Sequence, residues 1–335
     1  MIGRVVLRAF PMEGGRSVWQ YEVQEGVNAA SLCVGLTPEE GVNVLSRVFG
    51  LCRSAHTVAA RQALGVIPTV TSGYEGRKAQ VLEILRDHAI AFFLHLPPFF
   101  GLPSDRLLVQ QLSTGCADQR TVLGGDVSLA EMNACDLTYW LKESQKGEKT
   151  PLLLRLLACL RQKILPTWGR GEFPAIEMST LMKVEENIIS SGYDASLWPD
   201  YALTPLLQSV VAQDGGVSLF ARILARVLDM IACLDGDIMM RPAAWLSGEV
   251  LPQGWGLTRA ARGVLFHKAD VQAGKIKAYT VISPTQWHIS VKKGMGGMMD
   301  RLLATLPLGE EGRLTVQVLL CALNPCVPVT IYPTV

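Results

Sequence analysis

The sequence has little charge and no excess of either sign. Charged residues make up 18% of its 335 residues, and 31 lysines and arginines stand against 30 aspartates and glutamates. Because proteins that bind nucleic acids usually carry a basic excess on one face, we expect no nucleic-acid partner. Hydrophobic residues make up 49% of the chain, which predicts either an extensive core or surfaces that partner proteins cover.

The chain also lacks an apolar run long enough to cross a bilayer. Its two most apolar windows are residues 89–100, which are too few, and residues 314–335, which prolines and polar residues interrupt. A membrane helix needs about 20 consecutive apolar residues. Residues 1–10 include two arginines and no continuous apolar segment, which is not typical of a secretory signal. We therefore expect a cytoplasmic protein without a membrane span.

Sequence templates of several enzyme classes are missing as well. No phosphate-binding loop follows a predicted strand, and neither the G-x-S-x-G nor the H-E-x-x-H motif occurs. The eight cysteines form no C-x-x-C pair and no regular framework. In a reducing compartment most of them are expected to be small buried hydrophobes.

Helical patterns dominate what is present. Thr37 before Pro38 and two glutamates is typical of a helix start. We expect short strands within residues 1–35 and a hairpin at residues 263–282. No repeat and no domain boundary is evident, so residues 1–335 are predicted to form a single α+β, mainly helical domain. The expected helices are 38–49, 53–64, 77–96, 128–143, 151–165, 204–213, 218–233, 295–306 and 314–322.

Cys52 and His56 are spaced i, i+4, which places both on one face of a helix. Thiolate and imidazole are metal ligands, but this spacing alone is common by chance, and a core cysteine with a hydrogen-bonded histidine explains it equally. Cys326 follows Asn324 and a proline, which restricts the backbone without identifying a ligand. His88 lies on an apolar helix and, with His95, is expected to be a satisfied core histidine.

Three segments in order resemble the large subunit of nickel–iron hydrogenases. Residues 47–56, RVFGLCRSAH, are similar to the family's R-I-C-G-x-C-x-x-x-H motif. Residues 261–287 contain ARG, GKIKAY and SPTQW, which are similar to A-P-R-G, G-K-I-x-x-Y and V-P-T-T-W. Residues 324–329, NPCVPV, are similar to D-P-C-x-x-C. The resemblance implies the large-subunit-like fold.

The departures from those motifs bear on the metal. In the family, four thiolates hold nickel and two of them bridge to an iron that carries cyanide and carbon monoxide. Here Phe49 stands where the first cysteine of the first motif would be, and Val329 where the last cysteine would be. Only Cys52 and Cys326 match metal ligands. The resemblance therefore implies an iron site without nickel, and no hydrogen turnover.

Other matching positions imply contacts to such an iron group. Arg262 is similar to the arginine that donates to a cyanide nitrogen, and Ser283, Pro284 and Thr285 match the segment that contacts the other cyanide. His56 is expected to donate a hydrogen bond to a coordinating sulfur. Glu13, in a segment similar to R-x-E-G, is expected to lie near the residues that bind the iron group.

The combination resembles the HupK/HoxV-type hydrogenase maturation proteins. It implies a non-enzymatic scaffold or chaperone that transiently holds the iron–dicyano–carbonyl fragment and passes it to the hydrogenase large subunit. The implied partners are a small maturation chaperone, the iron-ligand assembly complex and that large subunit. Two alternatives stay open: a structural or interaction protein that has lost all metal chemistry, and a hydrogenase with an altered metal site.

Overall fold

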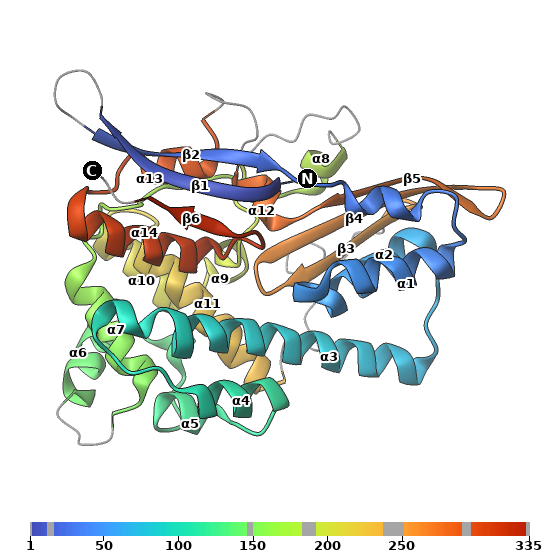
Figure 1. The fold of residues 1–335 in the computed structure, drawn as a ribbon. Coiled ribbons are helices and arrows are strands. Elements are labelled where there is room, and N and C mark those ends of the chain that lie inside the picture. Colours follow the sequence, from blue (N-terminus) through green and yellow to red (C-terminus); the bar gives the residue numbers. More distant parts are fainter. Residues whose placement is uncertain are drawn as a thin grey trace.

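The structure is a computed structural model that describes residues 2–11, 17–145, 150–182, 192–236, 251–289 and 296–332 (Figure 1). The strands are β1 Ile2–Pro11, β2 Ser17–Glu25, β3 Trp255–Ala260, β4 Gly263–Gln272, β5 Lys275–Ile282 and β6 Val329–Ile331. The α-helices are α1 Pro38–Val48, α2 Arg53–Leu64, α3 Val70–Ala89, α4 Arg106–Thr114, α5 Gln119–Leu123, α6 Ala134–Ser144, α7 Leu152–Lys163, α8 Met178–Met182, α9 Trp198–Tyr201, α10 Pro205–Asp214, α11 Leu219–Leu234, α12 Pro284–His288, α13 Met298–Leu303 and α14 Gly309–Leu323. Short helical turns are η1 Ala29–Cys33, η2 Gly50–Cys52, η3 Ile90–His95, η4 Pro97–Phe100 and η5 Leu129–Glu131, of which η3 is a π-helix.

The described strands form two three-stranded sheets. The first has the order β2-β1-β6, in which β1 and β2 are antiparallel and β6 runs parallel to β1, with Val5 opposite Val329. The second is the antiparallel sheet β3-β4-β5. Figure 1 shows this second sheet beside α1 and α2, while β6 lies between β1 and α14. Strands from the two ends of the chain, β1 and β6, therefore pair in the first sheet.

The first half of β4, Gly263–His267, is buried on both faces, whereas its last three residues are exposed. On one face of the sheet, Leu265 and Ala269 pack with the alanines of α2. On the opposite face, Phe266 packs with Trp287. Gly256 of β3 allows α2 to approach, because a Cβ there would lie 1.9 Å from the Ala59 carbonyl oxygen. The hairpin is thus clamped against the helix that follows Cys52.

The helical core is organised around α11, in which nearly every side chain is buried. Its Asp229 accepts hydrogen bonds from Tyr201 (2.9 Å) and lies 2.8 Å from His88 Nε2. His88 also contacts Arg226 through Nδ1 at 3.0 Å. The expectation of a satisfied core histidine is confirmed for His88, but it is wrong for His95, which is exposed.

Most expected helices form, and the departures have local causes. The helix expected at 77–96 begins at Val70 and changes to the π-helix η3 after Ala89. The helices expected at 128–143 and 295–306 are shorter, since the described helices there are α6 and α13. The hairpin at 263–282 is confirmed, although β3 beside it had no distinct pattern. In the described part of the chain, no helix is both long and apolar enough to cross a membrane.

Candidate functional site

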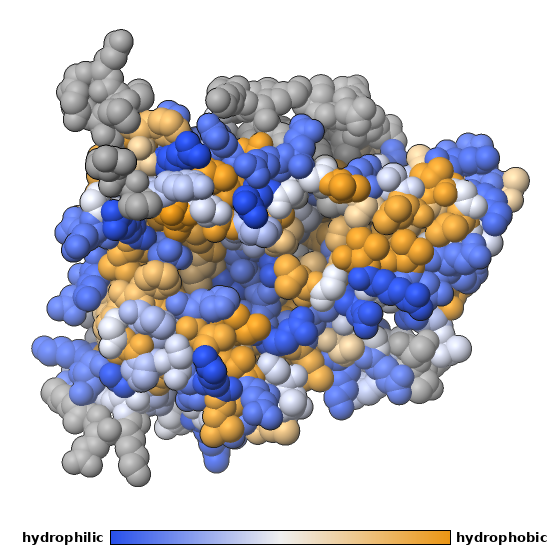
Figure 2. Space-filling view, viewed as in Figure 1, coloured by the Kyte–Doolittle hydropathy of each residue, from blue (hydrophilic) through white to orange (hydrophobic). Residues whose placement is uncertain are grey.

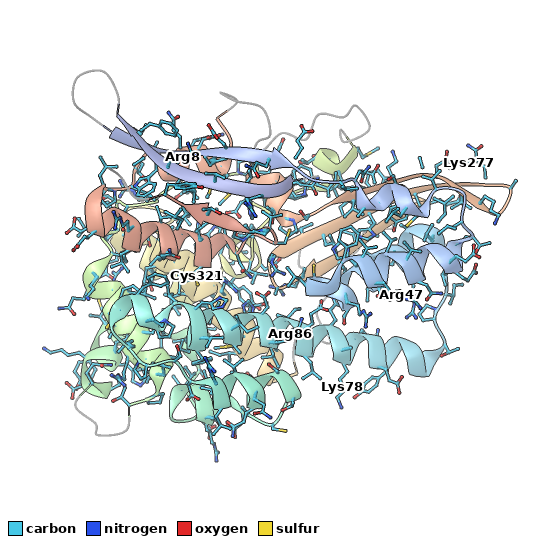
Figure 3. All side chains as sticks on the ribbon, in the orientation of Figure 1. Arg8, Arg47, Lys78, Arg86, Lys277 and Cys321 are labelled. Atoms are coloured by element: carbon cyan, nitrogen blue, oxygen red, sulfur yellow. The ribbon has the colours of Figure 1, made fainter. Side chains whose placement is uncertain are left out.

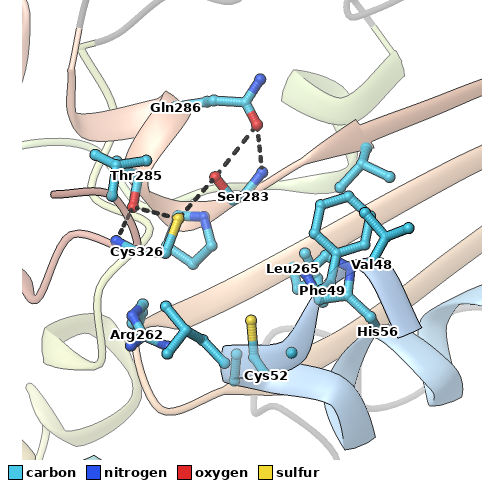
Figure 4. A pocket seen from close by; sticks show the side chains of 16 residues that line it. Val48, Phe49, Cys52, His56, Arg262, Leu265, Ser283, Thr285, Gln286 and Cys326 are labelled. Atoms are coloured by element: carbon cyan, nitrogen blue, oxygen red, sulfur yellow. Dashed lines mark hydrogen bonds between the residues drawn. The ribbon is translucent and has the colours of Figure 1, made fainter. Parts of the chain in front are cut away.

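A cavity of about 220 Å³ lies where the α1–α2 turn, the hairpin, α12 and the segment after α14 meet. Cys52 and Cys326, from distant parts of the sequence, both line it (Figure 4). The expected residues His56, Arg262, Ser283, Pro284 and Thr285 line the same cavity. Glu13 lies outside the described residues, so its expected place near the site stays a prediction.

Cys52 ends the short turn η2 and precedes the first residue of α2. The thiol does not cap the helix. Instead, Glu83 of α3 accepts hydrogen bonds from the backbone N–H groups of Ser54 (2.8 Å) and Ala55 (3.3 Å). A carboxylate at a helix N-terminus satisfies otherwise unpaired donors and the helix dipole. Arg86, labelled on α3 in Figure 3, donates to the Leu51 carbonyl at 3.2 Å, so α3 holds this turn at two points.

Cys326 is held by α12. Asn324 ends α14 in the left-handed conformation (φ 47°), and the following proline prevents the helix from continuing. The Cys326 backbone N–H donates to Thr285 Oγ1 at 3.0 Å, and the Thr285 hydroxyl donates to Cys326 Sγ at 3.2 Å. Ser283 Oγ lies 3.9 Å from the same sulfur. Two hydroxyl groups therefore face the Cys326 sulfur (Figure 4).

Arg262 lies in the tight turn between β3 and β4, and only 8% of its surface is exposed. The turn requires glycine next to it: Gly263 has φ +113°, and a Cβ there would lie 1.8 Å from the Ala195 carbonyl oxygen. Arg262 Nη2 donates to Asp87 Oδ2 at 2.7 Å. Its Nε and Nη1 are sealed from solvent and have no protein partner among the described residues.

Asp87 of α3 connects Arg262 to the segment that carries Cys326. Its other carboxylate oxygen accepts from Asn324 and lies 3.4 Å from Arg226. Burial alone raises the pKa of Asp87, but Arg262 and Arg226 outweigh it and the pKa is lowered. Asp87 is therefore ionised and fixes two sides of the cavity. Sequence reasoning missed it, as it missed Glu83, because neither belongs to a motif that the resemblance covers.

An aromatic stack and a hydrogen-bonded chain form the wall beside Cys52. The Phe49 and His56 rings are parallel, with centroids 3.9 Å apart and an interplanar angle of 6°. His56 Nδ1 lies 3.0 Å from His267 Nε2, and His267 Nδ1 lies 2.8 Å from the Tyr279 hydroxyl. Among the described residues, His56 has its hydrogen bond to His267 and none to a cysteine sulfur. The expected bond to sulfur stays a prediction for its other nitrogen, Nε2.

Burial favours the neutral forms of Cys52 and of the two histidines beside it. Burial raises the pKa of the Cys52 thiol to about 12, against the opposing effect of Arg262. Burial also lowers the pKa of His56 to about 3 and that of His267 well below its usual value. Within the described ranges, no group of three or more His, Cys, Asp and Glu residues is arranged to hold a metal ion. The described residues thus offer two sulfurs and one cation at this cavity.

The rim of the cavity is apolar and open to solvent. Val48 is 41% exposed and Leu51 is 60% exposed, and both line the cavity. Figure 2 shows apolar residues gathered over α1 and η1. In and just after η1, Leu32 is 57% exposed and Val34 is 50% exposed. Apolar surface of this kind is typical of sites that other proteins cover.

Comparison with known proteins gives matches along the whole chain. Residues 217–331 match the family model described as nickel-dependent hydrogenase. The hydrogenase expression/formation protein HupK of Rhodobacter capsulatus is 27% identical over 98% of this chain and 96% of that protein. The hydrogenase expression/formation protein HupV of Azotobacter chroococcum is 25% identical over 88% of each.

The fold matches solved hydrogenases. The Ni-Fe-Se hydrogenase of D. vulgaris Hildenborough superimposes with a TM-score of 0.61 over 94% of each chain, at 15% sequence identity. Both sheets and the helical core of the present chain therefore belong to one known architecture. This chain is therefore similar over most of its length to the HupK and HupV hydrogenase expression/formation proteins, and it has the fold of the nickel–iron hydrogenase large subunit.

Proposed function

We propose that this protein is a non-catalytic hydrogenase maturation scaffold. It holds an iron–dicyano–carbonyl fragment as cargo and passes it to a hydrogenase large subunit, in cooperation with a maturation chaperone and the complex that assembles the iron ligands. The observation that carries the proposal is that Cys52 and Cys326 line one cavity together with Arg262. The names of the curated relatives support a role in hydrogenase formation.

The donor set suits such a cargo better than a bare metal ion. An iron that already carries cyanide and carbon monoxide needs few protein ligands, and thiolates bind iron well. Cyanide bound to iron is an anionic hydrogen-bond acceptor, so the Arg262 guanidinium that lines the cavity is a suitable partner for it. At the same cavity the Thr285 hydroxyl is a further donor, to Cys326 Sγ, and the Ser283 oxygen accepts from the Cys326 thiol at 3.9 Å.

The size of the cavity is consistent with this cargo. A cavity of about 150 Å³ in another protein admits benzene, and this one measures about 220 Å³. The stack of the half-buried Phe49 on the buried His56 occupies the side where the resemblance predicts a missing thiolate. Nickel, which would need further sulfur ligands there, is not expected to be retained.

Infrared spectroscopy tests the proposal. The protein is purified without oxygen from a host that matures hydrogenases, and its iron and nickel are measured. We expect cyanide and carbonyl stretching bands, iron without stoichiometric nickel, and no hydrogen oxidation. Folded protein without the bands would favour a metal-free structural role, and hydrogen oxidation with stoichiometric nickel would establish an enzyme instead.

Cysteine variants test the assignment of the ligands. Cys52→Ala and Cys326→Ala should each abolish iron retention, while stability falls by only about 1 kcal/mol for the lost sulfur contacts. Cys159→Ala is the matched control, since Cys159 is also half-buried but lies on α7 and does not line the cavity. Bands that persist in both cavity variants would show that the ligand assignment is wrong.

A further inference from the structure

The chain from His56 through His267 to Tyr279 restricts where its protons can lie. The nitrogens His56 Nδ1 and His267 Nε2 are 3.0 Å apart, so one of them must donate and the other accept. The same holds for His267 Nδ1 and the Tyr279 hydroxyl at 2.8 Å. Burial lowers the pKa of both imidazoles, and each neutral ring carries a single N–H.

Two arrangements satisfy these contacts. In the first, the Tyr279 hydroxyl donates to His267 Nδ1, His267 Nε2–H donates to His56 Nδ1, and the proton of His56 is on Nε2. In the second, all directions are reversed: His56 Nδ1–H donates to His267 Nε2, and His267 Nδ1–H donates to the Tyr279 oxygen. The two arrangements differ in which end of the chain is left with a donor that has no acceptor.

Burial decides between them. In the second arrangement the hydroxyl proton of Tyr279 has no acceptor, because His267 is its only hydrogen-bond partner among the described residues and Tyr279 is 6% exposed. In the first, the unpaired donor is His56 Nε2–H. His56 lines the cavity, and its Nε2 is not among the sealed polar atoms without a partner. A donor that reaches a cavity costs less than one sealed in the core.

We propose that Tyr279 and His267 are positioning residues that hold the proton of His56 on Nε2, so that this nitrogen donates a hydrogen bond into the cavity. The Phe49 ring, stacked on His56 at 3.9 Å, keeps the imidazole plane fixed. The ligand class is an acceptor such as a coordinating thiolate or an anionic group bound to the metal. The placement of the proton on His56 Nε2 is argued from the metal-free geometry alone. The further step, that this N–H donates to a bound iron fragment, rests on the proposed function.

Nitrogen NMR of the metal-free protein tests the placement directly. The chain has five histidines, so selective ¹⁵N-histidine labelling gives a spectrum that single-histidine variants can assign. Protonated and unprotonated ring nitrogens have well-separated shifts. We expect both His56 and His267 as the Nε2–H tautomer. His56 found with its proton on Nδ1, or with the two tautomers equally populated, overturns the proposal.

Tyr279→Phe tests the cause of that placement. Without the hydroxyl donor the chain can reverse, and we expect His56 to gain the Nδ1–H tautomer at least severalfold. Tyr201→Phe is the matched control: Tyr201 is also 6% exposed and also loses one hydroxyl bond, but its partner is Asp229. If the His56 tautomer is unchanged in a folded Tyr279→Phe protein, Tyr279 does not position the proton of His56.

The infrared experiment separates this inference from the proposed function. If the iron fragment is present, Tyr279→Phe should shift the carbonyl and cyanide bands without removing them, whereas Tyr201→Phe should leave them in place. Bands that do not move would contradict the use of His56 as a donor to the cargo. If wild-type protein carries no bands, the proposed function fails while the NMR result still decides the tautomer.

Discussion

Thr285 and Cys326 exchange a reciprocal pair of hydrogen bonds: the Cys326 backbone N–H donates to the threonine hydroxyl oxygen at 3.0 Å, and that hydroxyl donates to the cysteine sulfur at 3.2 Å. Thr285 is 2% exposed, so both bonds lie away from solvent. One side chain thereby fixes the backbone of Cys326 and also supplies a donor to its sulfur. A sulfur that accepts such a bond is held in one orientation toward the cavity.

Thr285→Val removes the hydroxyl and keeps the shape of the side chain. The Cys326 N–H loses its acceptor, so the free energy of unfolding should fall by about 1–3 kcal/mol, and iron retention should fall as well. Thr315→Val is the control, because Thr315 is also fully buried and its hydroxyl bonds to the Glu311 carbonyl at the opposite end of α14. Urea unfolding and metal analysis measure the two effects. Equal iron retention in both variants would argue against a role for the Thr285 hydroxyl.

Glu83→Ala should loosen the turn that carries Cys52. The carboxylate caps the first N–H groups of α2, and removal of a helix cap costs about 1 kcal/mol. We expect that loss in the free energy of unfolding, together with faster hydrogen exchange at Ser54 and Ala55. Glu83→Gln keeps one carbonyl oxygen as an acceptor and should fall between the wild type and the alanine variant. If exchange at the two amides does not change, Glu83 does not hold the turn.

Asp87→Asn should be the most destabilising of these changes. It leaves Arg262 and Arg226 buried with their shared carboxylate removed, and an uncompensated buried charge costs about 3–5 kcal/mol. Asp126→Asn breaks the Arg120–Asp126 pair, whose side chains are 67% and 69% exposed, and should change the stability far less, because exposed ion pairs are screened by solvent. Chemical denaturation of both variants gives the comparison. Similar losses for the two would mean that the arginines near the cavity are solvated.

Stability should decrease as the solution is acidified below neutrality, in part through His288. Burial lowers its pKa to about 4, from 6.5. Above pH 6.5 the group is neutral in both the folded and unfolded states. As the pH falls from 6.5 to about 4, only the unfolded state takes up the proton, so His288 alone removes about 3 kcal/mol of stability across that range.

His288→Gln should flatten this pH dependence. The His288 Nε2 accepts a hydrogen bond from the Ala195 N–H at 3.1 Å, and a glutamine oxygen can take that place without titrating. His95→Gln is the control, because His95 is exposed. Thermal unfolding at pH 7, 6, 5 and 4.5 measures the slope. If stability falls with pH equally in the wild type and in His288→Gln, His288 does not cause the loss of stability in acid.

Local patterns predicted the elements that position the site. Thr37 and Glu40 form the capping box that begins α1, and the hairpin strands pair as their alternation and turn residues indicated. The resemblance placed Cys52, Arg262, Thr285 and Cys326 together, and the cavity contains all four. Their roles toward a metal stay predictions.

Residues whose partners are distant could not be predicted in the same way. Glu83 and Asp87 lie on α3, where a carboxylate on a helix is most often a solvated surface group, and their function depends on α2 and on Asn324. His267 lies on an apolar strand and becomes meaningful only when α2 brings His56 to within 3.0 Å. The three-residue strand β6 is too short to show a period, and it forms because β1 supplies a parallel edge.

The parallel pairing of β6 with β1 makes the two sulfurs mechanically unequal. The Cys326 segment is tethered on both sides, by Asn324 to α3 and by Val329 to β1. The turn that carries Cys52 is held from one side, by Glu83 and Arg86 of α3, and its Leu51 side chain is 60% exposed. We therefore expect the cavity to open by displacement of the Cys52 turn, so that a group shared between the sulfurs would part from Cys52 first and leave from the Cys326 side last.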